Sequence, residues 1–96
     1  MIKVRVTTIL ALKKILGQGE VEVSLPAGST VKDLLRWMIE RWGGELASRL
    51  LDPGSDSPLP HVRFMVNGRS IEFLKGLDTV LQEGDEFLML PLVSGG

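Results

Sequence analysis

The chain ends in a predicted strand that is apolar on both faces, "FLMLPLV", and this feature constrains its fold more than any other. The other predicted strands alternate apolar and polar residues, as strands with one solvated face do. If Phe87 and Met89 point into the core, Leu88 and Leu90 point out of the opposite face of the sheet. That outer face is then either shielded by the long loop at residues 52–60 or is an interaction patch.

Two segments near the start show the alternation of half-buried strands, "IKVRVT" (residues 2–7) and "EVEVSL" (residues 20–25). Lysine and arginine lie on the polar face of the first, and glutamates lie on the polar face of the second. Such opposite charges suit an antiparallel pair of strands. The segment between them is too long for a tight hairpin and is predicted to form a turn of helix before Gly17.

An amphipathic helix is predicted to follow the second strand. Thr30 is expected to cap its N-terminus, with Asp33 three residues later in a variant of the capping box. Its apolar residues recur at helical spacing and form one stripe. Trp37 lies off this stripe, and two explanations stay open: the next segment, "ELASRLL", folds back over it, or it contacts a partner.

The second half of the chain predicts three more strands. "DPGSDSPLP" is a loop by composition, and "HVRFMV" after it is a strand with Met65 on the same face as Leu88. Asn67 and Gly68 are a strong hairpin signal, and "RSIEFL" is expected to be the short returning strand. The strand after the helix and the last strand cannot both lie at an edge of a compact sheet. The last strand is therefore expected in the middle, beside the first, in a fold of the α+β class.

Composition argues against several classes of protein. The absence of cysteine removes disulfides, thiolate nucleophiles and sulfur-ligated metals. The charges are balanced, with 11 basic and 12 acidic side chains, and only three Phe and two Trp are present to stack on bases, so nucleic acid is not an expected partner. His61 is the only histidine, and it is expected to be an exposed structural residue. We expect no enzyme activity of its own, no permanently bound cofactor and no metal.

Targeting signals are not apparent either. The opening residues alternate rather than forming a basic end followed by an apolar block, so no signal peptide is predicted. The longest apolar run is far shorter than the roughly 20 residues that cross a bilayer. We therefore expect a cytoplasmic protein that does not associate with membranes.

The last six residues, "PLVSGG", are expected to extend beyond the fold. Pro91 lacks the N–H that sheet pairing needs, so the sequence predicts a single domain over residues 1–90 and a flexible tail over residues 91–96. The side chains of the tail become smaller toward its end, in the order Leu92, Val93, Ser94, Gly95, Gly96. That shape suits entry into a narrow channel.

The stretch "VNGRSIEFLKGLDTVLQEGDEFLMLPLVSGG" (residues 66–96) resembles the MoaD/ThiS family of ubiquitin-like sulfur carriers. The likeness is clearest in "NG", "GLDT", "EGDE" and the P-x-V-S-G-G ending. The opening "VTTIL" and the segment "RLLDPGS" also resemble CysO-like and MoaD-like carriers. The resemblance covers essentially the whole chain. It implies a β-grasp (ubiquitin-like) fold, with a mixed sheet of four to five strands covered on one face by one main helix.

The resemblance also implies a chemistry and its partners. In that family an adenylating enzyme of the ubiquitin-activating type consumes ATP to activate the terminal carboxylate, and a sulfur donor then displaces AMP. Gly96 would bear the thiocarboxylate, and Gly95 would give a slim approach to it. The second implied partner is a sulfur-accepting synthase subunit. The leading pathways are molybdopterin synthesis, in which the chain would be the small subunit of the synthase, and cysteine synthesis.

Partner-binding positions follow from the same resemblance. They lie on the outer face of the sheet and in the tail, at Met65, Leu88, Leu90, Arg5, Arg63, Leu92 and Val93. Two other functions stay open at this point. One is a protein modifier joined to lysines of its targets through Gly96, and the other is a β-grasp binding module whose glycines are incidental.

Overall fold

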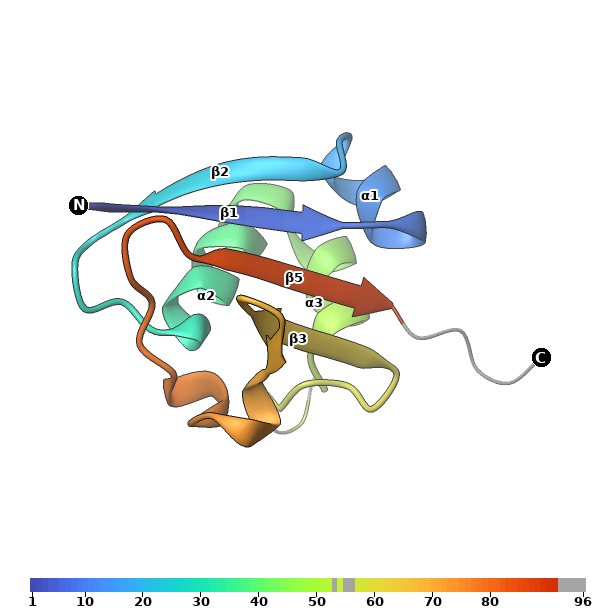
Figure 1. The fold of residues 1–96 in the computed structure, drawn as a ribbon. Coiled ribbons are helices and arrows are strands. Elements are labelled where there is room, and N and C mark those ends of the chain that lie inside the picture. The colour runs from blue at the N-terminus through green and yellow to red at the C-terminus, as the bar shows by residue number, and fades with distance from the viewer. Residues whose placement is uncertain (53, 55–56, 92–96) are drawn as a thin grey trace.

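The computed structural model describes residues 1–52, 54 and 57–91, which form a five-stranded sheet with helices packed on one face (Figure 1). The strands are β1 (Ile2–Thr8), β2 (Glu20–Leu25), β3 (Val62–Val66), β4 (Arg69–Ser70) and β5 (Glu86–Pro91). The helices are α1 (Leu10–Leu16), α2 (Val31–Trp42) and α3 (Gly44–Leu50), with 3₁₀ turns η1 (Ile71–Phe73) and η2 (Gly76–Asp78). No helix in this described part of the chain is long and apolar enough to cross a membrane.

The strand order is β2-β1-β5-β3-β4, so the last strand lies in the middle of the sheet, beside the first. The pair β1 and β5 is parallel, whereas β1 with β2 and β5 with β3 are antiparallel. This mixed sheet with its crossing helix is the β-grasp arrangement. The sequence therefore predicted both the fold class and the position of the last strand correctly.

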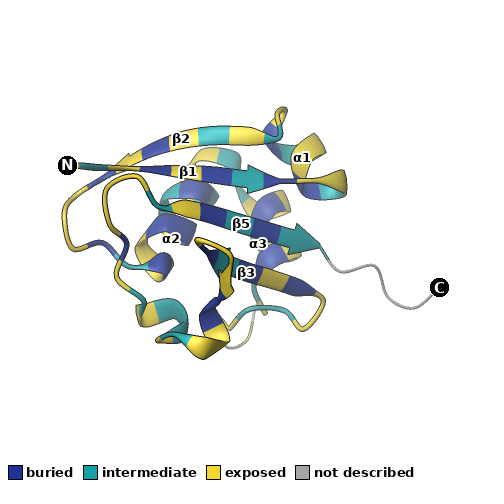
Figure 2. Ribbon diagram, in the orientation of Figure 1, coloured by how far each residue is buried: buried dark blue, intermediate teal, exposed yellow. Residues whose placement is uncertain are grey.

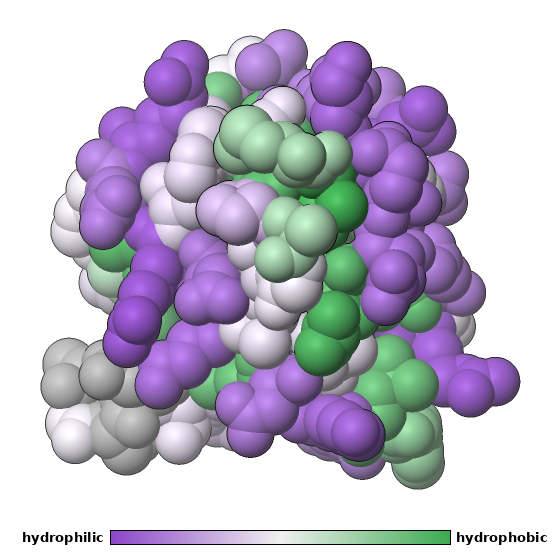
Figure 3. Space-filling view, turned by 90° about the vertical axis from the view of Figure 1, so that its left-hand side faces the viewer, coloured by the Kyte–Doolittle hydropathy of each residue, from purple (hydrophilic) through white to green (hydrophobic). Residues whose placement is uncertain are grey.

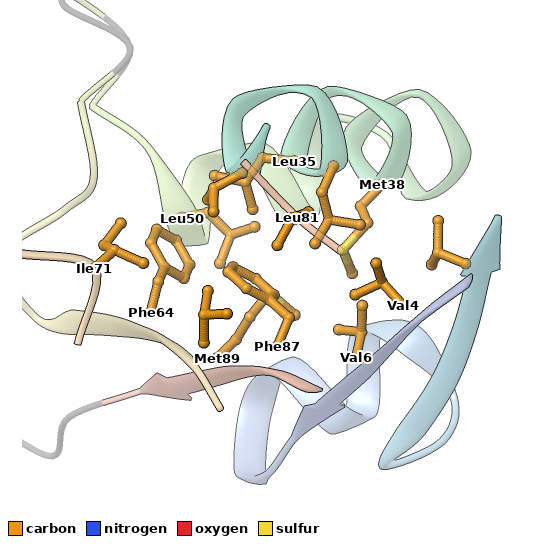
Figure 4. Close-up of a cluster of buried hydrophobic side chains, with 14 of the residues drawn as sticks. Val4, Val6, Leu35, Met38, Leu50, Phe64, Ile71, Leu81, Phe87 and Met89 are labelled. Carbon is orange, nitrogen blue, oxygen red and sulfur yellow. The ribbon is translucent and has the colours of Figure 1, made fainter. Parts of the chain in front are cut away.

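The core lies between the sheet and α2, and Figure 4 shows its side chains converging from both layers. Val4 and Val6 of β1 are buried, because the period of two turns them to the same face. Phe87 of β5 stacks on Phe64 of β3, with ring centroids 5.6 Å apart. Burial of each such side chain stabilises the fold by about 1.5–3 kcal/mol.

The cover over the sheet is more extensive than the one main helix that the sequence predicted. α1 adds Leu12 and Leu16 to the core, and α3 adds Leu46 and Leu50. Both helices have seven residues, too few for stability on their own, so helices of this length depend on tertiary packing. α2, with 12 residues, is the main helix that the sequence predicted, and α1 is the turn of helix expected before Gly17; the contribution of α1 and α3 to the core was not foreseen.

The hairpin at Asn67 and Gly68 is confirmed, but its returning strand is shorter than "RSIEFL" predicted. Both turn residues have positive φ, 51° and 82°, as a type I′ hairpin requires. Of this predicted strand, only the two residues of β4 pair with β3, and the chain then enters η1. Ile71 is thereby buried, whereas Phe73 is 79% exposed.

The end of the last strand also differs from the expected boundary. β5 includes Pro91, whose Cα pairs with that of Val62, so pairing continues one residue into the predicted tail. A proline at a strand end removes only its own N–H from the ladder, which the last position tolerates. The predicted tail residues 92–96 lie outside the described residues.

The two tryptophans of α2 lie together. The ring centroids of Trp37 and Trp42 are 6.3 Å apart in an edge-to-face arrangement. The guanidinium carbon of Arg41 lies 6.0 Å from the first ring centroid and 5.5 Å from the second. Trp37 thus meets an aromatic ring of its own helix, while the segment expected to fold over it buries leucines in the core.

The capping box at the start of α2 is confirmed. The Asp33 carboxylate accepts from the backbone N–H of Thr30 at 2.9 Å and from its hydroxyl at 3.1 Å. In return, the Thr30 hydroxyl oxygen accepts from the Asp33 N–H at 3.3 Å. The backbone hydrogen bond from Thr30 is the main cause that lowers the pKa of Asp33 below its ordinary value of 3.8.

This lowered pKa predicts an acid-dependent contribution to stability. Because the carboxyl holds its proton less tightly in the folded state, its contribution is complete above its ordinary pKa and is lost as the pH falls through the folded-state value. We expect the wild type to have a higher urea midpoint than Asp33→Asn at pH 7, and the difference to shrink below about pH 4. Denaturation curves of both proteins from pH 7 to pH 2 test this. A difference that stays constant on acidification would contradict it.

Candidate functional site

The face of the sheet that points away from α2 carries the predicted partner-binding residues of the described chain. Met65 of β3 pairs with Leu88 of β5, and Arg63 pairs with Leu90. Met65, Leu88 and Leu90 are only half-buried, and we call these three residues the outer patch. Figure 2 shows that residues of intermediate burial alternate with buried ones along β5. The structure therefore brings together the apolar residues that the sequence proposed.

The described residues of the long loop do not provide the shield considered for this face. They are held at the end of α3, where Leu51 pairs with Pro58. The Asp52 N–H donates to the Ser57 carbonyl at 2.8 Å, and the Leu59 N–H donates to the Leu50 carbonyl at 2.9 Å. Among the residues that the structure describes, the loop is thus tied to α3 and the outer patch stays partly exposed, which favours the alternative of an interaction patch.

The two arginines proposed to flank the outer patch differ in their surroundings. Arg5 donates from Nη1 to Glu86 Oε1 at 3.2 Å, and its Nε lies 3.1 Å from Glu20 Oε1. These pairs are exposed, so each contributes little to stability. Arg63 is also exposed, and it has no ion pair within the described part of the chain. Arg63 is thus the better placed of the two to bind an acidic partner group.

The strand that carries Leu88 and Leu90 of the outer patch, β5, also leads to the end of the chain. Thr8 Oγ1 donates to the Met89 carbonyl at 2.7 Å in a buried hydrogen bond that joins the ends of β1 and β5. Two residues later β5 ends at Pro91. The remaining predicted site residues follow it and lie outside the described residues: Leu92, Val93, Gly95 and Gly96.

A metal site, a role for the histidine and a second apolar surface are the other candidates among the described residues. Within ranges 1–52, 54 and 57–91, no three His, Asp or Glu residues lie close enough together to hold a metal ion. His61 is exposed, as predicted, immediately before β3 begins at Val62. The end of the molecule away from Pro91 is mostly hydrophilic, with apolar side chains in a narrow strip (Figure 3). These observations leave the outer patch as the main candidate surface.

Sequence reasoning missed one feature, at the junction between β1 and α1. Ile9 and Leu10 are exposed, with fractions of 44% and 53%. Leu10 has a φ of 55°, in the left-handed region that residues with a Cβ rarely adopt. A signal was present in "VTTIL", where the alternation of the first strand stops and two large apolar residues follow each other.

Comparisons with known proteins match the chain to small proteins of the same fold. A family model described as the ThiS family matches residues 9–96. The chain is 34% identical over 84 residues to small archaeal modifier protein 3 of Haloferax volcanii, covering 88% of each chain. It is 33% identical over 81 residues to the sulfur carrier protein CysO of Mycobacterium tuberculosis, covering 83% of each. A chain of the Amycolatopsis orientalis BexX/CysO complex matches with a TM-score of 0.81 and 26% identity, covering 97% of this chain and 99% of that one.

Proposed function

The chain belongs to the ThiS family, and from this premise we propose that it is a sulfur carrier whose reacting group is the carboxylate of Gly96. A carboxylate is a poor electrophile until it gains a leaving group. In the proposed reaction, a carboxylate oxygen attacks the α-phosphorus of ATP and pyrophosphate leaves. Sulfide (HS⁻), supplied by a donor, then attacks the acyl carbon, AMP leaves and the attacking sulfur loses its proton, which gives the thiocarboxylate. The partner enzyme binds the ATP, and the carrier needs no cofactor of its own.

The observation that carries this proposal is that two of the three residues of the outer patch lie on the strand that leads to Gly96. Leu88 and Leu90 lie on β5, which ends at Pro91. Five residues later in the sequence is Gly96, and five residues can span at most about 18 Å. An enzyme that docks on the outer patch therefore has the reacting group within a short distance of its own surface.

The relatives support the class of function and suggest the pathway. The identity of 33% with the sulfur carrier CysO favours cysteine synthesis as the destination of the sulfur, with molybdopterin synthesis as the alternative. In either pathway the proposal needs two partners, an adenylating enzyme and an enzyme that accepts the sulfur. Because the first step consumes ATP, we place it in the cytoplasm.

A second candidate function is protein modification, favoured by the identity of 34% with small archaeal modifier protein 3. In this case the ε-amino nitrogen of a lysine attacks the activated carbon of Gly96. AMP or an enzyme thiol leaves, and an isopeptide bond forms. Activation of Gly96 is common to both functions, and only the nucleophile differs.

The mass of the C-terminal peptide, taken from native cells, tests the proposal and separates it from the alternative. Replacement of oxygen by sulfur adds about 16 mass units, nearly the same as oxidation of one of the four methionines, so fragmentation must locate the change. A shift on Gly96 that reacts with a thiol alkylator supports the carrier. Gly96 joined to lysines supports the modifier instead. Unmodified Gly96 during active sulfur assimilation would contradict both.

Substitution of Leu88 by glutamine tests the role of the outer patch. We expect the KM of the adenylating enzyme for the carrier to rise about tenfold, because burial of a leucine side chain contributes about 1.5–3 kcal/mol. Ser24→Gln is the matched control, since Ser24 is exposed on β2 and pairs with Lys3, on the polar part of the same face. Pyrophosphate exchange kinetics measure both variants. Equal KM values for the two would count against docking on the outer patch.

A further inference from the structure

We propose that the β1–α1 junction, centred on Ile9 and Leu10, is a second docking element for the adenylating enzyme, in addition to the outer patch. This inference rests on the proposed function, because it assumes an enzyme that takes the end of the chain. The partner surface that it fits is an apolar spot with acidic side chains beside it.

The junction lies beside the end of β5. The buried hydrogen bond of 2.7 Å from Thr8 to the Met89 carbonyl fixes the end of β1 beside the end of β5. α1 begins two residues after Thr8 and contacts β5. Figure 1 shows α1 and the end of β5 at the same end of the molecule. An enzyme that receives the residues after Pro91 therefore meets this junction as it approaches.

Leu10 also has a backbone conformation that is unusual for its residue type. Its φ of 55° places a residue with a Cβ in the left-handed region, and more than half of its surface is exposed. The next leucines of the same helix, Leu12 and Leu16, are buried, so α1 already contributes fully to the core without Leu10. Strained backbone of this kind concentrates at functional sites. Here the strain holds an apolar side chain in solvent, where it does nothing for the fold.

Asn67 shares this backbone conformation, but the fold gives a reason for it. Asn67 is the other residue besides glycine with positive φ in the described part of the chain. It is a residue type that tolerates this conformation. Its side chain donates to Asp85 at 2.9 Å and accepts from the Glu86 N–H at 2.9 Å, so the structure accounts for its conformation. Leu10 has no comparable polar group, and a bound partner accounts for it instead.

Charge gives the chemistry of the partner. Lys13 and Lys14 are exposed on α1 and have no ion pair among the described residues. Together with Leu10 they line an open hollow at the junction. Arg63, beyond the far side of β5, carries charge of the same sign. A partner surface that buries Leu10 is therefore complementary if it carries carboxylates opposite these lysines.

The order of the chemical steps identifies which enzyme this partner is. A carrier and a modifier differ in the nucleophile that finally takes the activated carbon. Both first need adenylation of Gly96, so the adenylating enzyme is the partner common to both uses. A docking element beside the end of β5 is therefore used by the adenylating enzyme, whichever nucleophile reacts later.

Kinetics of ATP–pyrophosphate exchange test the inference, with each purified ubiquitin-activating-type enzyme of the source organism. Leu10→Asn keeps a residue that tolerates positive φ but removes the apolar side chain. We expect about a tenfold rise in the KM for the carrier with little change in kcat, as for an interface anchor. Leu10→Met is expected to restore most of the affinity. Phe73→Asn is the matched control, because Phe73 is even more exposed but lies in η1.

The outcomes separate this inference from the function on which it rests. If no enzyme adenylates the wild type, the proposed function fails. If the wild type is adenylated and Leu10→Asn has the same KM, the docking element is wrong and the function stands. A urea midpoint of Leu10→Asn no lower than that of the wild type confirms that the variant is folded. If the urea midpoint of Leu10→Asn is lower than that of the wild type, Leu10→Met is used instead. A KM for Leu10→Met far above that of the wild type would then count against an apolar contact at this position.

Charge reversal at the two lysines tests the acidic part of the partner surface. We expect Lys13→Glu and Lys14→Glu each to raise the KM severalfold at low ionic strength. The effect should weaken in 0.5 M salt, because the Debye screening length is then only about 4 Å. An effect that is absent, or independent of salt, would overturn the proposed charge complementarity.

Discussion

Deletion of Gly96 is expected to abolish adenylation without changing the stability of the protein. The deletion moves the terminal carboxylate back by one residue, about 3.5 Å, and a misplacement of 1 Å alone can cost roughly 100-fold in rate. The sheet described by the structure ends at Pro91, so the urea midpoint should be the same as that of the wild type. ATP–pyrophosphate exchange and a denaturation curve measure the two effects separately.

Ser94→Ala is the control for this deletion. It changes the same segment but keeps the length of the chain and both glycines, and we expect it to retain nearly full exchange activity. An exchange rate for the deletion within twofold of the wild type would mean that the terminal residue is not the reacting one. The carrier and modifier functions would then both have to be given up.

Phe87→Ala is expected to give the largest loss of stability of any single substitution in the sheet. Phe87 has no exposed surface, lies on the central strand and stacks on Phe64. Removal of a buried phenylalanine side chain costs about 3–5 kcal/mol in the free energy of unfolding. Since small domains have about 5–15 kcal/mol in total, the variant should be close to unfolding at 37 °C. Urea denaturation at 25 °C measures the loss.

Phe73→Ala provides the comparison within the same residue type. Phe73 is largely exposed, and its replacement should change the free energy of unfolding by no more than about 0.5 kcal/mol. A loss below about 1 kcal/mol for Phe87→Ala would show that the core does not depend on this ring as the structure implies.

The parts of the fold that were predictable from the sequence depend on local patterns. The alternation in β1 and β2, the capping box of Thr30 and Asp33, and the turn at Asn67 all follow from residues within a few positions of each other. The roles of α1 and α3 did not follow, because helices of seven residues are stabilised by packing rather than by their own sequence. The early end of β4 likewise follows from burial of Ile71, which is a tertiary requirement.

The candidate site shows the same division. The outer patch was predictable because an apolar strand in the middle of a sheet must present alternate residues on the face without helices. The ion pairs of Arg5 were harder to predict, since Glu20 and Glu86 come from different strands and their register decides the contact. The conformation of Leu10 had no signal in its residue type, because leucine has no preference for positive φ.

The parallel pairing of β1 with β5 has a consequence for synthesis of the protein. Arg5 pairs with Glu86, so the ribosome must complete almost the whole described chain before the central pair of strands can form. Long-range pairing of this kind makes folding late and slow. A nascent chain that stops before β5 leaves β1 without its central neighbour, and quality-control proteases should remove it. A chain that has folded has therefore already been translated through β5, the strand that leads to Gly96.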